Sequence, residues 1–181
     1  PYPEPDRLSI LWTRYLPPSG FDIPKFAISG PEVLDIREET RTLESLGIYA
    51  TSSRTLTGDD QAAERVRVGL FSASMLPTLG VRPEVGRWLS VDEDVPDGPA
   101  VTVLSHALWE SRFGADPGVV GRSVLMNGVP TEVVGVMPES FEFPSGARAW
   151  LPLGLTRESQ GSRGGHSLVA VGRLAEGMTQ T

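Results

Sequence analysis

The sequence predicts an α+β fold built from many short elements and divided into two lobes. The 20 glycines and 16 prolines interrupt the 181-residue chain too often for a helical bundle. Some segments repeat apolar residues at helical spacing, whereas others alternate polar and apolar residues as strands do. The hydrophobic fraction of 39% is sufficient for a packed core, because chains of this length bury roughly 70% of their unfolded surface.

The N-terminal third is predicted to contain a strand, a helix and a second strand. The segment PYPEPDRL is extended and leads into an apolar run. Ser29 followed by Glu32 fits a capping box, and apolar residues continue at helical spacing to Leu46, with Gly47 as the stop. We therefore expect a strand at 8–12, a loop at 16–28, a helix at 31–46, a strand from residue 48 and a polar turn around 58–60.

The middle of the chain is rich in predicted strands. Arginine and valine alternate within residues 64–71, which indicates a strand with one solvent-facing side. Asn127–Gly128 lies between two apolar runs and is suited to the positive φ angles of a type I′ hairpin turn. We also expect a short helix at 72–79 closed by Gly80, irregular backbone at 81–89 and an acidic surface loop at 92–99. A buried strand at 100–104 should precede a helix that is capped by Ser105 and ended by Gly114. Hairpin strands are expected at 123–126 and 131–134, followed by a proline-interrupted aromatic segment at 141–153.

The C-terminal part contains a polar linker at 157–165 and a final strand at 167–174. Two joints, near Gly58 and near Gly161, divide the chain. The strand around Val169–Val171 should consequently pair in the same sheet as the strand around Ile10–Trp12. The expected units are a first lobe formed by residues 1–58 and 162–181, and a β-rich lobe inserted between them at residues 59–161.

Charge and cysteine content exclude several classes of function. The formal net charge is −7, and an acidic surface repels phosphate backbones, so binding to nucleic acid is not expected. The chain has no cysteine, which excludes disulfides, thiolate nucleophiles and cysteine-based metal sites. No apolar run approaches the about 18–20 residues that cross a bilayer. Because the chain begins at Pro1 without a methionine or signal peptide, we expect it to be part of a longer protein.

The histidines do not form a recognisable catalytic motif. A hydrolase could use His106 with Ser105 or Asp97, but the G-x-S-x-G elbow of many serine hydrolases is absent. His106 follows a helix cap, and His166 lies at the end of a linker. An ordinary solvated or capping role is therefore favoured for both.

The acidic and glycine-rich segments also favour structural interpretations. The run Asp92–Glu93–Asp94 with Asp97 could suggest calcium, but Pro96 and Asp97 break the EF-hand register, so a solvated loop is favoured. Asp59–Asp60 is interpreted as a turn. Neither Gly114, Gly118 and Gly121 nor the linker Gly161–Gly165 has the spacing of a nucleotide-binding loop. Trp12, Trp88, Trp109 and Trp150 are dispersed and are expected to pack in cores. We assign no catalytic, cofactor-binding or metal-binding residue, and the substrate-binding residues are unknown.

Several blocks taken together resemble the extracytoplasmic core domain of MacB-like ABC-transporter permeases. Each block is weak alone, but their order and spacing cover nearly the whole chain. The blocks are PYPEPDRL, DIREETRTLESLGIYA, VRVGLFSASMLPTLGVRPEVGRWL, VTVLSHALWESRFGADPGVVGRSVLMNGVPTEVVGVMPESFEFP, WLPL and GRLAEGMT.

The resemblance implies a porter-like α+β subdomain interrupted by a smaller, β-rich, sabre-like subdomain, without an enzymatic activity or cofactor of its own. It implies a domain outside the inner membrane, facing the periplasm or the extracellular side, between the first and second membrane helices. Its partners would be a second permease copy, a cytoplasmic ABC ATPase and a periplasmic adaptor. After Gly177–Met178–Thr179 the family pattern continues further, so the resemblance leads us to expect an incomplete first lobe in this chain. The alternative is a free-standing periplasmic module that binds a peptide or a lipid.

Overall fold

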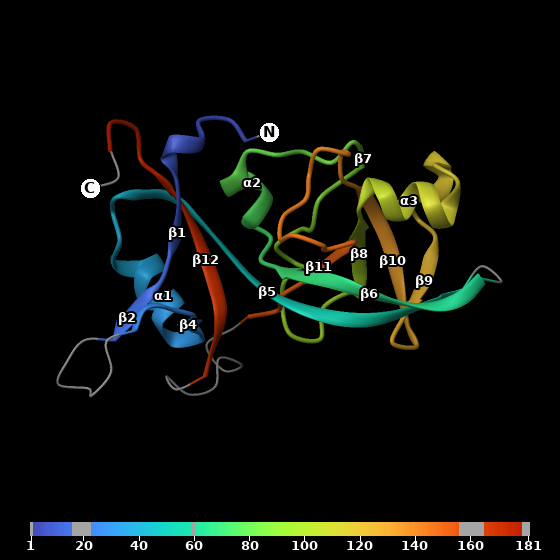
Figure 1. The fold of residues 1–181 in the computed structure, drawn as a ribbon, viewed down its shortest axis with the longest axis horizontal. Helices are drawn as coiled ribbons and strands as arrows, with labels where there is room; N and C mark the ends of the chain where they lie inside the picture. The colour runs from blue at the N-terminus through green and yellow to red at the C-terminus, as the bar shows by residue number, and fades with distance from the viewer. Residues whose placement is uncertain (1, 16–22, 59–60, 156–164, 179–181) are drawn as a thin grey trace.

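The computed structural model describes residues 2–15, 23–58, 61–155 and 165–178. The fold is mixed α+β, mostly strands with few helices, as the sequence predicts. The molecule is elongated, with α1, β1, β4 and β12 toward one end and α3, β8, β9 and β10 toward the other (Figure 1). The strands are β1 (Leu8–Leu11), β2 (Thr13–Tyr15), β3 (Ile23–Phe26), β4 (Ile28–Ser29), β5 (Leu43–Gly58), β6 (Gln61–Phe71), β7 (Val85–Gly86), β8 (Val101–Leu104), β9 (Ser123–Met126), β10 (Val129–Val136), β11 (Ala149–Pro152) and β12 (His166–Leu174). The α-helices are α1 (Gly30–Glu39), α2 (Met75–Leu79) and α3 (His106–Phe113), and short 3-10 turns occupy Pro5–Arg7 and Pro117–Val119.

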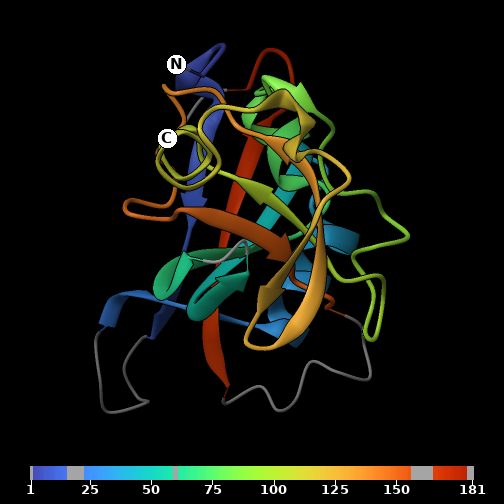
Figure 2. The ribbon, with the colours of Figure 1, turned by 90° about the vertical axis from the view of Figure 1, so that its right-hand side faces the viewer.

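One ten-stranded sheet runs along the molecule. Its strand order is β1-β12-β5-β6-β11-β8-β10-β7, with β4 paired to β12, and β9 paired to both β10 and β5. The end-on view shows β12 upright and β11 lying across it, so the sheet twists strongly between its two ends (Figure 2). This twist, which follows from the intrinsic twist of strands, lets one continuous sheet form two differently oriented halves.

The predicted pairing between the two ends of the chain is confirmed. β1 and β12 are antiparallel neighbours, with Ile10 opposite Val171 and Leu11 opposite Ala170. β12 also pairs with β5, where Val169 lies opposite Tyr49. The boundaries proposed for the two lobes stay a prediction, because the sheet itself continues through both halves.

Local capping signals place one end of each of the three α-helices: the start of α1 and of α3, and the end of α2. Glu32 accepts a hydrogen bond from the backbone N–H of Ser29 at 2.8 Å, which forms the predicted capping box of α1. The Ser105 hydroxyl accepts from the backbone N–H of Leu108 at 3.1 Å and caps α3. α2 ends at Gly80, whose φ of 69° lies in the left-handed region that glycine adopts without strain.

Several predicted segments differ in the structure, and one of them, the stretch at 81–89 that was expected to be irregular, contains β7, which pairs with β10. α1 ends at Glu39 instead of residue 46, because Leu43 and Leu46 belong to β5 and pair with Leu174 and Gly172 of β12. The segment expected to be a loop at 16–28 contains β3, which pairs with β2, and the start of β4. The aromatic segment at 141–153 contains β11, which inserts between β6 and β8. Pairing with distant strands decided the fate of residues 43–46 and of β11, whereas β3 pairs with its sequence neighbour β2.

Three clusters of apolar side chains form the core. The first lies under α3, the second surrounds α2 and β11, and the third packs beneath α1 against β12 and β5. Trp150 is fully buried in the second cluster, where its ring centroid lies 5.1 Å from that of Phe141 and 6.3 Å from that of Phe71. Trp109 is buried in the first cluster and Trp88 packs on the second, whereas Trp12 is 42% exposed. The prediction of core packing therefore holds for three tryptophans and is wrong for Trp12.

The predicted hairpin tip is confirmed at Asn127–Gly128. Met126 lies opposite Val129, and the two turn residues have φ angles of 53° and 79°. We expect Gly128→Val to lower the free energy of unfolding by about 1 kcal/mol or more, because a β-branched residue resists positive φ. Urea unfolding measures the change, with Val129→Ala on the adjacent, exposed strand position as a control. An unchanged unfolding midpoint for Gly128→Val would contradict the turn assignment.

Candidate functional site

Two halves of the molecule, one containing β1, β4 and β12 and the other containing β6, β11, β8 and β10, meet along β5. Its first part pairs with β12 from Leu43 to Tyr49, and its second part pairs with β6 from Tyr49 to Gly58. One continuous strand therefore belongs to both halves, and Figure 1 shows it running between them. Backbone hydrogen bonds therefore tie β5 to β12 along its first part and to β6 along its second part.

Helix α2 and its preceding turn fasten this junction. The Ser72 hydroxyl accepts from the backbone N–H of Ile48 at 3.0 Å, and the Ser74 hydroxyl donates to the carbonyl of Leu46 at 2.8 Å. A Cβ at Gly47 would lie 2.8 Å from the Cα of Met75, so only glycine permits this approach of strand and helix. The segment thus packs against β5 backbone to backbone.

Arg173 fastens the same region from β12. Its side chain is buried, and Nε donates to the carbonyl of Thr78 at 2.8 Å, while another guanidinium nitrogen donates to the carbonyl of Pro3 at 3.2 Å. These contacts join β12, α2 and the N-terminal segment. These roles of Arg173, Ser72 and Ser74 could not be predicted from the sequence, because a lone arginine or serine carries no motif that indicates such a contact.

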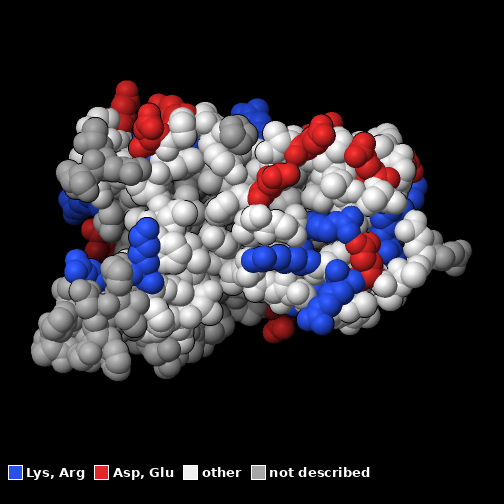
Figure 3. All heavy atoms as spheres, in the orientation of Figure 1, with Lys and Arg blue, Asp and Glu red and all other residues white. Residues whose placement is uncertain are grey.

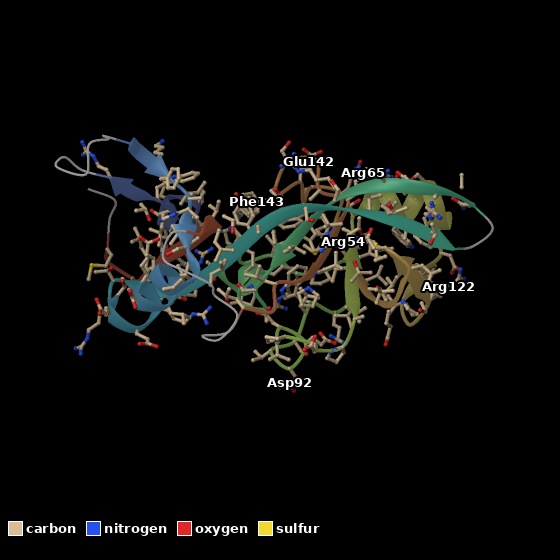
Figure 4. The ribbon with its side chains drawn as sticks, turned by 90° about the horizontal axis from the view of Figure 1, so that it is seen from below. Arg54, Arg65, Asp92, Arg122, Glu142 and Phe143 are labelled. Atoms are coloured by element: carbon tan, nitrogen blue, oxygen red, sulfur yellow. The ribbon has the colours of Figure 1, made fainter. Side chains whose placement is uncertain are left out.

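The acidic run is anchored instead of solvated, which corrects the predicted loop. Asp94 is half-buried and accepts from the backbone N–H groups of Ala73 at 2.9 Å and Gly154 at 2.8 Å. It therefore joins the turn before α2 to the segment that follows β11. Burial raises the pKa of the Asp94 carboxyl above its ordinary value, against the lowering effect of these hydrogen bonds. Figure 4 shows the neighbouring Asp92, which is exposed, on the outer side of this loop.

Glu93 is held by a different partner. Its carboxylate is buried and accepts from both terminal nitrogens of Arg87, at 2.6 and 3.0 Å, and from the backbone N–H of Ser90 at 2.8 Å. The hydrogen bonds from Arg87 lower the pKa of Glu93 below its ordinary value, despite an opposing contribution from burial. The solvated-loop prediction failed for Asp94 because its partners, Ala73 and Gly154, are distant in the sequence. It failed for Glu93 because no motif indicated that the nearby Arg87 and Ser90 bind its carboxylate.

The calcium interpretation gains no support from this geometry. Among the described residues, no three carboxylate or histidine side chains are grouped so that they could hold a metal ion. Asp97, with a φ of 55°, occupies a turn of the same loop. We expect the melting temperature in excess chelator to equal that in buffer alone, since no ion should be lost on chelation. Thermal unfolding followed by circular dichroism measures this, and a clear drop in melting temperature would restore a metal site at Asp92–Asp97.

The histidines have structural partners. His106 Nδ1 lies 3.0 Å from a carboxylate oxygen of Glu84, and Nε2 lies 3.6 Å from one of Glu110. Ser105 uses its hydroxyl to cap α3, and no hydrogen bond joins Ser105, His106 and Asp97 within the described residues. His166 Nε2 lies 3.4 Å from the carboxylate of Glu32, and its ring packs on Phe26. The geometry therefore gives no catalytic triad in this part of the chain.

The glycines considered as a nucleotide site end elements or form turns. Gly114 ends α3 with a φ of 62°, Gly118 belongs to the 3-10 turn that follows, and Gly121, with a φ of 88°, lies before β9. Asp59–Asp60 and most of the linker 157–165 lie outside the described residues.

The surface has an acidic hollow beside α3. Its volume is about 520 Å³, and its lining includes His106 and the exposed carboxylates Glu110, Glu139 and Glu142. Arg148 also lines it, but its charge is paired with Glu64. A second hollow, of about 560 Å³, lies between β1 and α1 and includes the partly exposed Ile10 and Trp12. Neither was predicted from the sequence, because each combines residues from separate parts of the chain.

A comparison with known protein families identifies the family to which this fold corresponds. A family model described as MacB-like periplasmic core domain matches residues 4–180. A comparison with curated proteins finds no match.

Three solved structures share the fold at low sequence identity. The periplasmic region of MacB from Actinobacillus actinomycetemcomitans has 15% identity and a TM-score of 0.68, over 96% of this chain and 77% of that one. A domain assigned to a permease protein from Porphyromonas gingivalis has 22% identity and a TM-score of 0.71, over 99% and 80% of the two chains. The extracellular domain of the noncanonic ABC-type transporter YknZ from Gram-positive bacteria has 17% identity and a TM-score of 0.61, over 86% and 74%.

Proposed function

The chain belongs to the MacB-like periplasmic core domain family of ABC-transporter permeases, and on this premise we propose that it couples cytoplasmic ATP hydrolysis to events outside the membrane. Membership places it extracytoplasmically, as a component of a transporter and not of a catalytic family. No helix in the described residues is long and apolar enough to cross a membrane. In this proposal the inner membrane is crossed by other parts of the permease.

The observation that carries the proposal is the shared strand β5. Leu8 and Arg173, which lie toward opposite ends of the chain, are direct neighbours in the β1–β12 pair. Membrane helices attached at the two chain ends would therefore move this pair, and β12 would pass the movement through β5 to β6. The hydrogen bonds of Ser72 and Ser74 keep α2 fixed to β5 during such a movement.

The division into two lobes forms part of this proposal. The porter-like lobe would comprise residues 1–58 and 162–181, and the sabre-like lobe residues 59–161. The contacts of Ser72, Ser74 and Arg173 between the two lobes would make them move together. The domain would carry no catalytic or cofactor-binding residues, and its partners would be a second permease copy, a cytoplasmic ABC ATPase and a periplasmic adaptor. The family assignment favours this function over a free-standing binding module.

A distance measurement in the full-length permease, assembled with its ATPase, tests the coupling. The chain has no cysteine, so Val120→Cys, at an exposed position beyond α3, introduces a single spin-label site in each domain copy. We expect pulsed electron spin resonance to give different distances between the two copies in the nucleotide-free and ATP-bound states. A label on the membrane part serves as the positive control. Equal domain distances in both states, with a shift in the control, would refute the coupling role.

The isolated chain should be monomeric at tens of micromolar concentration. A membrane-tethered pair of domains reaches an effective concentration on the order of millimolar, so a weak contact suffices in the transporter. Without the tether this advantage is lost, and two chains of net charge −7 repel each other modestly at physiological salt. Light scattering should therefore give a mass near 19.5 kDa. A stable dimer at this concentration would indicate a strong interface within the domain itself.

A further inference from the structure

The outer face of the β5–β6 hairpin is basic. Strand alternation directs Arg65 and Arg67 to this face, where the opposite β5 positions are Thr55 and Ser53. All four side chains are exposed. Glu64, the acidic residue of β6, is already paired with Arg148 and Arg112. Within the described part of the chain, Arg65 and Arg67 form no ion pair, so their charges face solvent uncompensated.

The acidic hollow borders this basic face. Gly146, which lines the hollow, would place a Cβ 3.9 Å from Cδ of Arg67, and the backbone N–H of Arg148 donates to the carbonyl of Arg67 at 2.8 Å. Glu139 and Glu142 are exposed and form no ion pair among the described residues. Figure 3 shows acidic side chains lying above a group of basic side chains on one face, and Figure 4 shows Glu142 and Arg65 along the same side of the molecule.

We propose that this face contacts a second copy of the chain across a two-fold axis, with Arg65 and Arg67 of each copy directed at Glu139 and Glu142 of the other. Adjacent patches of opposite charge are self-complementary under two-fold symmetry, because each patch then meets its opposite twice. The hollow of about 520 Å³ is roomy enough to admit an arginine side chain from the partner.

The contact is weak by its chemistry. Exposed ion pairs contribute little each and are screened by salt. The inference rests on the proposed function in one respect: the permease dimer supplies the local concentration at which a weak contact forms. The interface would thus favour one arrangement of the two domains without holding the isolated chains together at micromolar concentration.

Charge exchange tests this pairing with the chain itself. Small-angle X-ray scattering over a concentration series up to about 1 mM, the effective concentration of a tethered pair, measures the dissociation constant. We expect wild-type self-association at low salt, and weakening by about tenfold or more for Arg65→Glu/Arg67→Glu and for Glu139→Arg/Glu142→Arg. An equimolar mixture of the two variants should regain the wild-type affinity, because each basic patch again meets an acidic one. Circular dichroism and the melting temperature confirm that these exposed substitutions leave the fold intact.

The outcomes separate this inference from the coupling role. A wild-type chain that stays monomeric up to about 1 mM at low salt, or a variant mixture that does not regain affinity, would overturn the two-fold contact. The two-fold contact would also be overturned if Arg65→Glu/Arg67→Glu abolished binding of an acidic partner protein but left self-association of the chain unchanged. Each of these results leaves the nucleotide-dependent domain distances in the full-length permease untouched. Conversely, unchanged distances with successful charge exchange would refute coupling but retain the contact.

Discussion

Replacing Trp150 with alanine is expected to destabilise the chain more than any other change considered. Trp150 is fully buried between Phe71 and Phe141, and its indole N–H donates to the carbonyl of Phe143 at 3.0 Å. Removing a buried tryptophan typically costs about 3–5 kcal/mol, which is a large share of the about 5–15 kcal/mol that stabilises a domain. We therefore expect a fall in melting temperature of about 10 °C, since 1 kcal/mol corresponds to about 2–4 °C at this size.

Trp12→Ala provides the matched control. Trp12 is 42% exposed and lies outside the three core clusters, so its removal should change the free energy of unfolding much less. Guanidinium unfolding followed by far-ultraviolet circular dichroism measures both variants without relying on tryptophan fluorescence. Equal destabilisation by the two substitutions would contradict the placement of Trp150 in the core.

Asp94→Ala is expected to loosen the acidic loop from the ends of β6 and β11. The substitution removes the acceptor for the N–H groups of Ala73 and Gly154, which follow the paired strands β6 and β11. Leaving such donors without a partner costs about 2 kcal/mol in total, because both are partly accessible to water. Hydrogen exchange should show faster exchange at Ala73 and Gly154 than in the wild type. Asp92→Ala, on the exposed side of the same loop, should leave both rates unchanged.

Asp94 and Glu93 should have opposite effects on stability as the pH changes. Burial raises the pKa of Asp94, so its contribution to stability is largest below the unfolded pKa and falls as the pH rises through the folded pKa. Arg87 lowers the pKa of Glu93, so its contribution is present above the unfolded pKa and is lost as the pH falls through the folded pKa.

The isosteric variants Asp94→Asn and Glu93→Gln separate these contributions. On acidification from neutral pH, wild type should gain stability relative to Asp94→Asn and lose stability relative to Glu93→Gln. Urea unfolding of the three proteins between about pH 7 and pH 3, a range that spans ordinary carboxyl titration, measures the differences. Parallel pH profiles for all three proteins would show that neither carboxyl has a perturbed pKa.

The basic face of the β5–β6 hairpin could be predicted from the sequence, whereas the acidic hollow beside it could not. The alternation of arginine and valine predicted that Arg65 and Arg67 lie on the solvent-facing side of a strand, and the structure confirms this. The neighbouring acidic hollow could not be predicted, because Glu110 lies on α3 while Glu139 and Glu142 lie on the segment between β10 and β11. Only the insertion of β11 between β6 and β8 brings these segments together.

The sequence by itself determined the features that depend on a few neighbouring residues: the positive φ angles of Asn127–Gly128, the caps supplied by Ser29 and Ser105, and the end of α2 at Gly80. It also determined the family, through blocks spread over the chain. Tertiary structure decided where a local preference competed with a distant partner. Leu43 and Leu46 have helical spacing, yet β12 recruits them into β5, because sheet hydrogen bonds and burial outweigh the weak helix preference of a few residues. Asp94 looks like part of a solvated run, yet the N–H groups of Ala73 and Gly154, both distant in the sequence, bind its half-buried carboxylate.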